Sequence, residues 1–259
     1  TPVTWTYTDV AGNASAQIQN FIINDNTSPN VITKNDTLYL DASGQSILLT
    51  SQIDNGSSDN CGIGSFALNK TSFSCSDVGL NAVVLTVTDI NGNSDAGSSM
   101  VLVVDTISPV IATQIVTAYI DQTGNKIISA SDVNNGTADA CGISSISLSD
   151  SIFNCSDVGL TNTTFTAIDA NGNTSSSIVS VTVSDTAKPI VVTQNISVYL
   201  DSNGQITISP SDINNGSTDN CGIASMALND STFDCSNLGP NSITLTVTDV
   251  NSNVSFSSA

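Results

Sequence analysis

The sequence predicts an all-β protein made of tandem immunoglobulin-like β-sandwich repeats of about 80 residues, arranged as an extended array. The main observation is an acidic turn after a strand that recurs every 80 residues, as DVAGN, DINGN, DANGN and DVNSN beginning at Asp9, Asp89, Asp169 and Asp249. A fixed period of this length indicates repeated domains. In addition, abundant Thr, Val and Ile lie between clusters of Gly, Asn, Asp and Ser, which is typical of short strands joined by turns.

The period divides the chain into four parts. Residues 1–25 match the last two strands of a preceding repeat. Val3, Trp5 and Tyr7 alternate with threonine in the same way as the apolar residues Val83, Leu85 and Val87 alternate with their neighbours. This match predicts that Trp5 lies on a buried face. The first repeat is expected at 26–105, the second at 106–185 and the third at 186–259, whose last strand is incomplete. We therefore expect a segment of a longer array.

Proline-containing joints separate the repeats. They run over Asp25–Pro29, Asp105–Pro109 and Asp185–Pro189. Proline fixes its own φ and cannot donate to a β-ladder, so these joints are predicted to be short and fairly stiff.

Within the first repeat, a strand ending at Leu40 is followed by the turn Asp41–Gly44, in which Asp caps the turn and Gly accepts positive φ. A second strand containing Leu48 leads to the polar loop at 51–60. A hairpin is then expected to open at Cys61 and to close at Cys75.

The strand before the acidic turn has one apolar face. In the third repeat Ile243, Leu245 and Val247 alternate with threonine and serine, which is the period of a strand with one buried side. About seven short strands at this spacing predict a two-sheet sandwich of immunoglobulin type.

Charge excludes several classes of function. The chain has 23 acids, four lysines and neither arginine nor histidine, for a net charge of -19. Nucleic acid and anionic lipid are poor partners for such a surface. No apolar run is long enough to insert into a membrane. Acid pairs could suggest a glycosidase, but these acids recur identically beside turn residues, so no enzyme is expected.

Six cysteines fall as one pair per repeat at constant spacing. The predicted disulfides are Cys61–Cys75, Cys141–Cys155 and Cys221–Cys235. Closing such a loop would stabilise a small repeat by roughly 3 kcal/mol. Thiolate metal sites and redox chemistry are the alternatives, but there is no CxxC motif and no histidine. Disulfides indicate an extracellular or cell-surface protein.

The acidic turn has two interpretations. Asn-Gly and Asp are what a tight hairpin turn needs, and they are also sources of the hard oxygen ligands that Ca²⁺ prefers. In an immunoglobulin-type sandwich the start of the chain, the polar loop and the last turn share one pole. We favour Ca²⁺ at or near the joints over solvated turns. The first hairpin of the preceding repeat, with Asp41 or Asp121, should face the same joint.

The predicted metal ligands follow from this pole. They are Asp25, Asp54, Asp59, Asp89, Asn91 and Asn93 for the first repeat; Asp105, Asp132, Asp139, Asp169, Asn171 and Asn173 for the second; and Asp185, Asp212, Asp219, Asp249, Asn251 and Asn253 for the third.

The runs "SNLGPNSITLTVTDVNSN" and "SDVGLNAVVLTVTDINGN" resemble the closing half of HYR domains, which are extracellular adhesion modules, and D-T-x-x-P resembles their opening. The whole unit, with "VYLDSNGQITISPSDINNGSTDNCGIASMAL" and "STFDCSN", is similar to the tandem repeats of very large surface adhesins of gliding Bacteroidota. The resemblance covers all three repeats and the N-terminal part. Ala11, Ser252 and Ala140 depart from the repeat pattern, so the joints are not expected to bind metal equally.

The resemblance implies a filament that is exported to the outer cell surface, moved by gliding machinery and attached to an external surface, often through polysaccharide. We therefore expect a disulfide-stapled, Ca²⁺-stiffened stalk whose partners are neighbouring repeats and, through the full-length adhesin, an extracellular surface or polysaccharide. Two alternatives remain: carbohydrate-binding repeats, against which a buried Trp5 would count, and spacer domains of a secreted multidomain enzyme.

Overall fold

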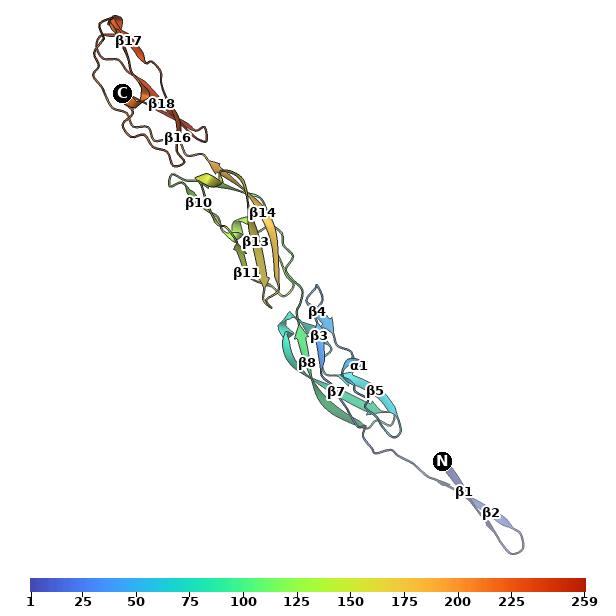
Figure 1. Ribbon diagram of the computed structural model, residues 1–259. Helices are drawn as coiled ribbons and strands as arrows, with labels where there is room; N and C mark the ends of the chain where they lie inside the picture. Colours follow the sequence, from blue (N-terminus) through green and yellow to red (C-terminus); the bar gives the residue numbers. More distant parts are fainter. The chain divides into compact units, whose positions relative to one another are not determined.

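The structure is a computed structural model that describes all 259 residues, and the chain forms two compact units, Thr1–Ile107 and Ser108–Ala259. The division falls inside the joint predicted at 105–109. Regular structure is almost entirely β, interrupted only by single turns of helix (Figure 1).

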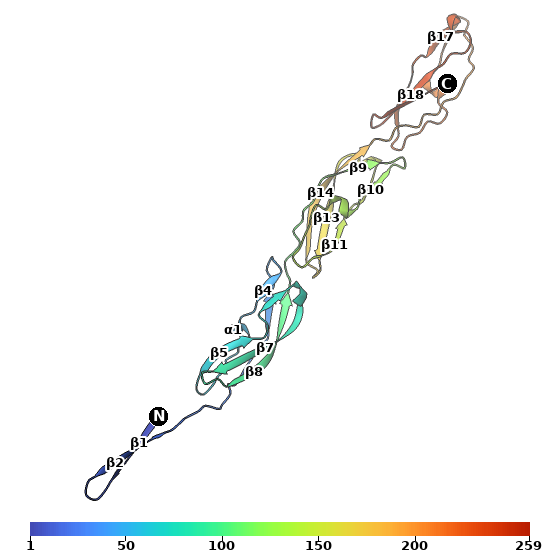
Figure 2. The same ribbon diagram turned by 180° about the vertical axis from the view of Figure 1, so that it is seen from behind.

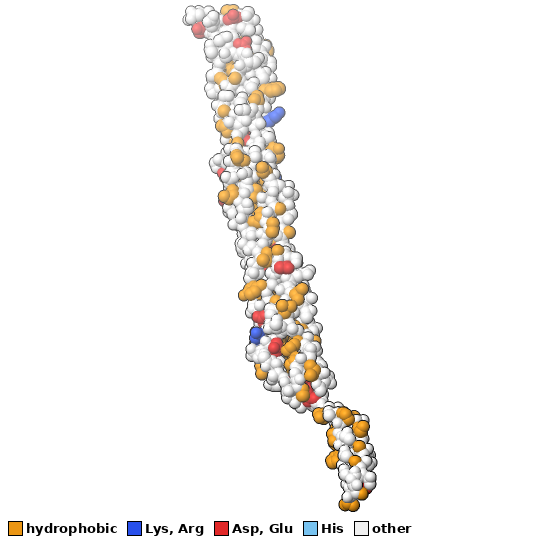
Figure 3. All heavy atoms as spheres, turned by 90° about the vertical axis from the view of Figure 1, so that its right-hand side faces the viewer, with side chains coloured by type: hydrophobic (Ala, Val, Ile, Leu, Met, Phe, Trp, Pro, Cys, Tyr) orange, Lys and Arg blue, Asp and Glu red, His pale blue; other side chains and the backbone are white.

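The N-terminal part is a hairpin of β1 (Pro2–Thr8) and β2 (Ala14–Asn20), which pair only with each other. Every residue of both strands is exposed, and apolar side chains cover much of the hairpin, at the lower end of Figure 3. The prediction that Trp5 lies on a buried face is wrong, since 51% of its surface is exposed. The reason is that this two-stranded sheet has no third strand and no second layer against it.

The first repeat contains six strands and one α-helical turn. They are β3 (Asp36–Tyr39), β4 (Gln45–Ile47), α1 (Thr50–Ile53), β5 (Ile63–Leu68), β6 (Ser72–Ser74), β7 (Gly79–Asp89) and β8 (Ser94–Val104), with a 3-10 turn at Cys75–Asp77. Four strands form one sheet in the order β3-β8-β7-β5, and β4 and β6 form a second, two-stranded sheet.

The second repeat has the same order of elements and the same two sheets, here β11-β13-β14-β9 and β10-β12 (Figure 2). Its elements are β9 (Val116–Ile120), β10 (Asn125–Ile127), α2 (Ala130–Val133), β11 (Ile143–Leu148), β12 (Ile152–Asn154), β13 (Gly159–Asp169) and β14 (Thr174–Asp185), with a 3-10 turn at Cys155–Asp157.

The third repeat keeps this plan with one strand fewer. Its elements are β15 (Gln205–Thr207), α3 (Pro210–Ile213), β16 (Ile223–Leu228), β17 (Thr232–Asp234), β18 (Thr244–Asp249) and β19 (Val254–Ser258), with a 3-10 turn at Cys235–Asn237. The larger sheet is β16-β18-β19. In the second repeat β9 pairs in parallel with Val181–Asp185, and the equivalent segment of the third repeat, 196–200, has no such partner.

Period-two burial confirms the predicted sandwich. Val83, Leu85 and Val87 of β7 are fully buried while the residues between them face outward, as the alternation predicts. Leu48, directly after β4, and Ile53, the last residue of α1, are also fully buried. The core therefore lies between the larger sheet and the layer formed by the short strands and α1.

The hairpin expected between Cys61 and Cys75 is wrong. β5 pairs with β7 and β6 pairs with β4, so these two consecutive strands belong to different sheets. Cys61 adjoins the turn after β7, where the amide of Ile90 donates to the carbonyl of Gly62. Cys75 instead lies beside the turn after β3, with Sγ 3.7 Å from the carbonyl oxygen of Gly44. The two cysteines of a repeat therefore lie at its opposite ends.

Candidate functional site: acidic clusters at the joints

The acidic turn is first a hydrogen-bonded turn. Oδ1 of Asp249 accepts from the amides of Asn251 and Asn253 at 2.8 and 2.7 Å, and Oδ2 accepts from the side-chain amide of Asn253 at 2.7 Å. Asp89 and Asp169 make the same bonds. The carboxylate is thus held in one orientation at the end of its strand.

These turns also contact the preceding joint. The side-chain amide of Asn93 donates to the carbonyl of Asp25 at 3.1 Å, and that of Asn253 donates to the carbonyl of Asp185 at 3.3 Å. The side-chain amides of Asn93 and Asn253 therefore tie the turn to the joint, a contact that was not among the sequence-based predictions.

The turns at Asp89 and Asp169 keep the aspartate ionised. Burial acts to raise the pKa of Asp89 and of Asp169, but hydrogen bonds from Asn93 and Asn173 outweigh it, and each pKa lies below its ordinary value of 3.8. A charged carboxylate is the form that binds a cation.

In the second unit, three predicted ligands come together. Asp185 is the last residue of β14, Asp219 lies near the end of the polar loop and Asp249 is the last residue of β18, and one carboxylate oxygen from each lies within 4.8 Å of the others. Asp185 is 6% exposed and Asp249 is 1% exposed. None of the three forms an ion pair with a lysine. Three carboxylates so close repel one another unless a cation separates them.

Several oxygen atoms of this cluster have no hydrogen-bond partner although they are buried. They are Oδ2 of Asp185, Oδ2 of Asp219, Oδ1 of Asn220 and Oδ1 of Asn251. Buried acceptors without a partner are rare, because leaving them so costs about 1–3 kcal/mol each. Carboxylate and amide oxygens are the ligands of Ca²⁺, which takes six to eight. The donor set thus fits a hard divalent cation, with backbone or water oxygens completing it.

Asn220 is a member of this site that the sequence analysis did not predict. Its side-chain nitrogen donates to the carbonyl of Asp121 in the second repeat at 3.1 Å and to Oδ1 of Asp185 at 3.2 Å. The signal was present in the sequence, since this position holds asparagine in the first and third repeats and alanine, Ala140, in the second. Asp121 takes part through its backbone carbonyl, because its side chain caps its own turn at Thr123.

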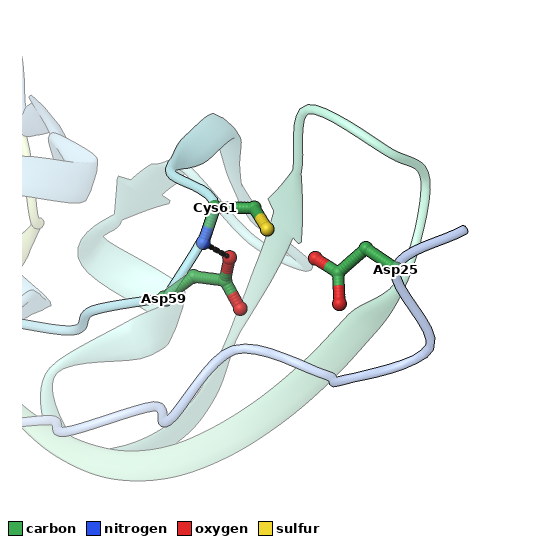
Figure 4. A group of neighbouring side chains, drawn as sticks. All are labelled: Asp25, Asp59 and Cys61. Atoms are coloured by element: carbon green, nitrogen blue, oxygen red, sulfur yellow. Dashed lines mark hydrogen bonds between the residues drawn. The ribbon is translucent and has the colours of Figure 1, made fainter. Parts of the chain in front are cut away.

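The first unit contains a similar cluster of Asp25, Asp59 and Cys61 (Figure 4). The two carboxylates point toward each other with the sulfur of Cys61 beside them. Oδ1 of Asp59 accepts from the amides of Cys61 and Gly62, whereas Oδ2 of Asp25 and Oδ2 of Asp59 are buried without partners. A hydrogen bond to Asp25, together with burial and the nearby carboxylates, raises the pKa of the Cys61 thiol.

Three predicted ligands are used elsewhere. Asp132 and Asp212 accept from the amides of Ser129 and Ser209 at 2.7 Å and so cap α2 and α3. Asp54 accepts from the amide of Ser57 at 3.0 Å. None of the three is among the grouped acids.

The remaining predicted ligands keep their local geometry. Asp105 is buried and accepts from the amide of Ile107, and Asp139 accepts from the amide of Cys141, as Asp185 and Asp219 do with their own neighbours. Asp105 and Asp139 belong to different units, and their grouping stays a prediction.

The disulfides predicted within each repeat are wrong. Cys155 of the second repeat is bonded to Cys221 of the third, 66 residues later, while Cys61 and Cys235 are free. Cys75 and Cys141 are also disulfide-bonded. The physical reason is the topology described above: the two cysteines of one repeat lie at opposite ends, whereas Cys155 meets the start of the next repeat.

No helix in the structure has the length and apolar character needed to cross a membrane.

Similarity to known proteins is confined to solved structures. No known protein family matches the sequence, and no curated protein does. Solved structures that are similar include extracellular cadherin domains 1–4 of protocadherin gamma B7, with 13% identity, a TM-score of 0.33 and coverage of 96% of this chain and 79% of that one. Domains 1–2 of human protocadherin-24 give 13% identity, a TM-score of 0.34 and coverage of 62% and 100%. Immunoglobulin domains 1–4 of Sidekick-1 give 8% identity, a TM-score of 0.33 and coverage of 69% of this chain and 57% of that one.

Proposed function

We propose that this chain is a Ca²⁺-stiffened structural segment of an extracellular adhesive stalk. The observation that carries the proposal is the set of buried oxygens without partners on Asp185, Asp219, Asn220 and Asn251, next to the buried Asp249, where the second repeat meets the third.

A cation at this place would act on the geometry of the joint. Asp185 belongs to the linker, Asp219 to the polar loop and Asp249 to the last turn of the third repeat, so one ion would fix the linker against that repeat. Asn220 is also hydrogen-bonded to the second repeat through the carbonyl of Asp121. Bending the joint would then break metal–oxygen bonds, whereas without the ion the carboxylates repel and the joint loosens.

The adhesive context of the proposal rests on the sequence. The resemblance to HYR domains and to the repeats of gliding adhesins such as SprB supports a cell-surface location and attachment, through the full-length protein, to an external surface or polysaccharide. The disulfide between Cys155 and Cys221 supports an oxidising compartment. The proposal gives these repeats no catalytic role and no nucleic-acid partner.

One observation favours a second candidate, carbohydrate binding. Trp5 and Tyr7 are 51% and 65% exposed on the same face of the hairpin, and Gln17 lies opposite Trp5. Exposed aromatic rings with nearby amides can stack on sugars. However, the 80-residue period aligns Trp5 with the fully buried Leu85, which favours a core position in a complete repeat. A glycan array probed with the wild-type chain and with Trp5→Ala tests this candidate.

Calorimetry tests the main proposal. Adding Ca²⁺ to EDTA-treated protein should release or absorb heat and raise the melting temperature. Asp185→Asn with Asp219→Asn should remove one binding site. The matched control is Asp95→Asn with Asp230→Asn, which makes the same change in charge at exposed positions. Absence of any heat, with a melting temperature that EDTA leaves unchanged, would overturn the proposal.

A further inference from the structure

We infer that the Cys155–Cys221 disulfide carries tension directly from the second repeat to the third and keeps the segment between these cysteines out of the stretched path. The inference rests on the proposed function only in assuming that the chain is pulled along its length, and it does not depend on calcium.

The covalent connectivity of the chain decides which part of it is stretched. A cross-linked chain that is pulled at both ends is taut only along its shortest covalent route. Coming from the N-terminal side, that route reaches Cys155 directly after β12, crosses the disulfide and continues from Cys221, just before β16. The bypassed segment contains β13, β14, the joint at 185–189, β15 and α3.

In the second repeat, the bypassed segment includes the central strands of the larger sheet, which are therefore not pulled. β13 and β14 are its two middle strands and pair with each other over ten residue pairs, from Gly159–Val183 to Ile168–Thr174. Tension can reach β11, which flanks β13, because it lies between Cys141 and Cys155. The β13–β14 hairpin itself stays slack, so it can remain as a folded base on which β11 re-forms.

At the joint, the bypassed segment includes most of the acidic cluster, which is therefore not pulled. Asp185, Asp219 and Asn220 all lie between the two cysteines in sequence, so pulling does not stretch the backbone that presents them. Force enters the third repeat at Cys221 and not through the linker. A joint held in this way keeps its ligands together while the array is under load.

The second and third repeats pack closely around the Cys155–Cys221 disulfide. Sγ of Cys155 lies 3.5 Å from the carbonyl oxygen of Asn220 and 3.8 Å from that of Gly124. Gly124 has φ of +78°, and a Cβ there would lie 3.2 Å from the carbonyl oxygen of Asn220. The turn of the second repeat thus fits closely against the loop that carries Cys221.

The pairing across repeats has a measurable consequence that pairing within repeats lacks. A disulfide spanning 66 residues shortens the contour length of the stretched chain by about 240 Å, at about 3.6 Å per residue. A bond between Cys141 and Cys155 would span 14 residues and hide only about 50 Å.

Single-molecule stretching of the full chain, held by handles at its two ends, tests the inference. Two proteins are compared under oxidising conditions in EDTA: one carries Cys61→Ser and Cys235→Ser, which remove the free thiols, and the other carries Cys155→Ser and Cys221→Ser as well. The second protein should reach a final contour length about 240 Å greater. Equal lengths, or a gain of only about 50 Å, would overturn the inference.

This readout is independent of folding and of calcium. The final contour length is measured after all folded structure has been pulled apart, so it holds even if the second variant folds poorly. Because EDTA is present throughout, loss of the calcium proposal would leave the predicted difference in length unchanged.

Discussion

The side-chain amide of Asn220 donates a hydrogen bond to the backbone carbonyl of Asp121 at 3.1 Å, which fixes a loop of the third repeat to the first turn of the second. The same nitrogen donates to Asp185 at 3.2 Å, while the oxygen of that amide is buried without a partner. One side chain therefore links both repeats to the acidic cluster.

Asn220→Ala should weaken Ca²⁺ binding at this joint about tenfold, because it removes one candidate oxygen ligand and the contact that positions Asp185. The fold should survive, since alanine occupies the equivalent position at 140. Calcium titration by calorimetry measures the change, and Asn203→Ala, at an exposed turn, is the control. Equal affinities for all three proteins would remove Asn220 from the site.

Two thiols per chain should react with a thiol reagent in the native protein without reductant, because Cys61 and Cys235 are free and exposed. Cys61 should react more slowly at neutral pH than a cysteine thiol of ordinary pKa, since its raised pKa leaves less thiolate. Non-reducing peptide mapping should recover a fragment that joins Cys155 to Cys221. Pairing within each repeat predicts no reactive thiol, so a count of zero would contradict the structure.

Acid should destabilise the turns at Asp89 and Asp169. Their pKa values are below the ordinary 3.8 in the folded chain because hydrogen bonds from the following asparagines outweigh burial. The stabilisation they give is therefore fully present above pH 3.8 and is lost as the pH falls through the folded-state values.

Denaturant unfolding in EDTA, from about pH 6 to about pH 2, measures this loss. The variant with Asp89→Asn and Asp169→Asn should show a flatter decline below pH 4 than the wild-type chain. Parallel curves would show that the two carboxylates do not contribute.

Backbone conformation in the turn predicts opposite effects at two equivalent positions. Gly172 has φ of +92° and an added Cβ would meet nothing within 4 Å, so Gly172→Ala should cost about 1 kcal/mol from conformation alone. Ser252 has φ of 73° at the matching position, and Ser252→Gly should raise the free energy of unfolding by roughly 0.5 kcal/mol. Denaturant unfolding measures both, and changes of the same sign would refute the turn geometry.

The fold could be predicted because its signals are local and periodic. Alternation over Val83, Leu85 and Val87 predicts a strand with one buried face, and all three are fully buried. The recurring Asp turn predicted where such strands end, and the larger strands do end at Asp89, Asp169 and Asp249.

Strand partners could not be predicted in the same way. The period-two alternation of apolar residues predicts which side of a strand is buried, but it does not predict which strand lies beside it. β5 and β6 are consecutive and look like a hairpin, yet each pairs with a strand from elsewhere in the repeat. The wrong disulfide pairing rested on the constant spacing of one cysteine pair per repeat, together with that expected hairpin.

Part of the site was readable from the sequence and was missed. Ser129-x-x-Asp132 and Ser209-x-x-Asp212 are the pattern of a helix cap, and the structure uses both as caps. The 80-residue period also aligns Asp54 with Asn134 and Asn214, which all accept from a backbone amide in the same turn. By contrast, the proximity of Asp185, Asp219 and Asp249 depends on the pole that their three segments share.

Anomalous X-ray scattering from crystals grown with Ca²⁺ would locate the proposed ion itself. We expect a peak at the joint between the second and third repeats, about 2.3–2.6 Å from carboxylate oxygens of Asp185 and Asp219. A well-ordered joint in which only water lies between these carboxylates would contradict it.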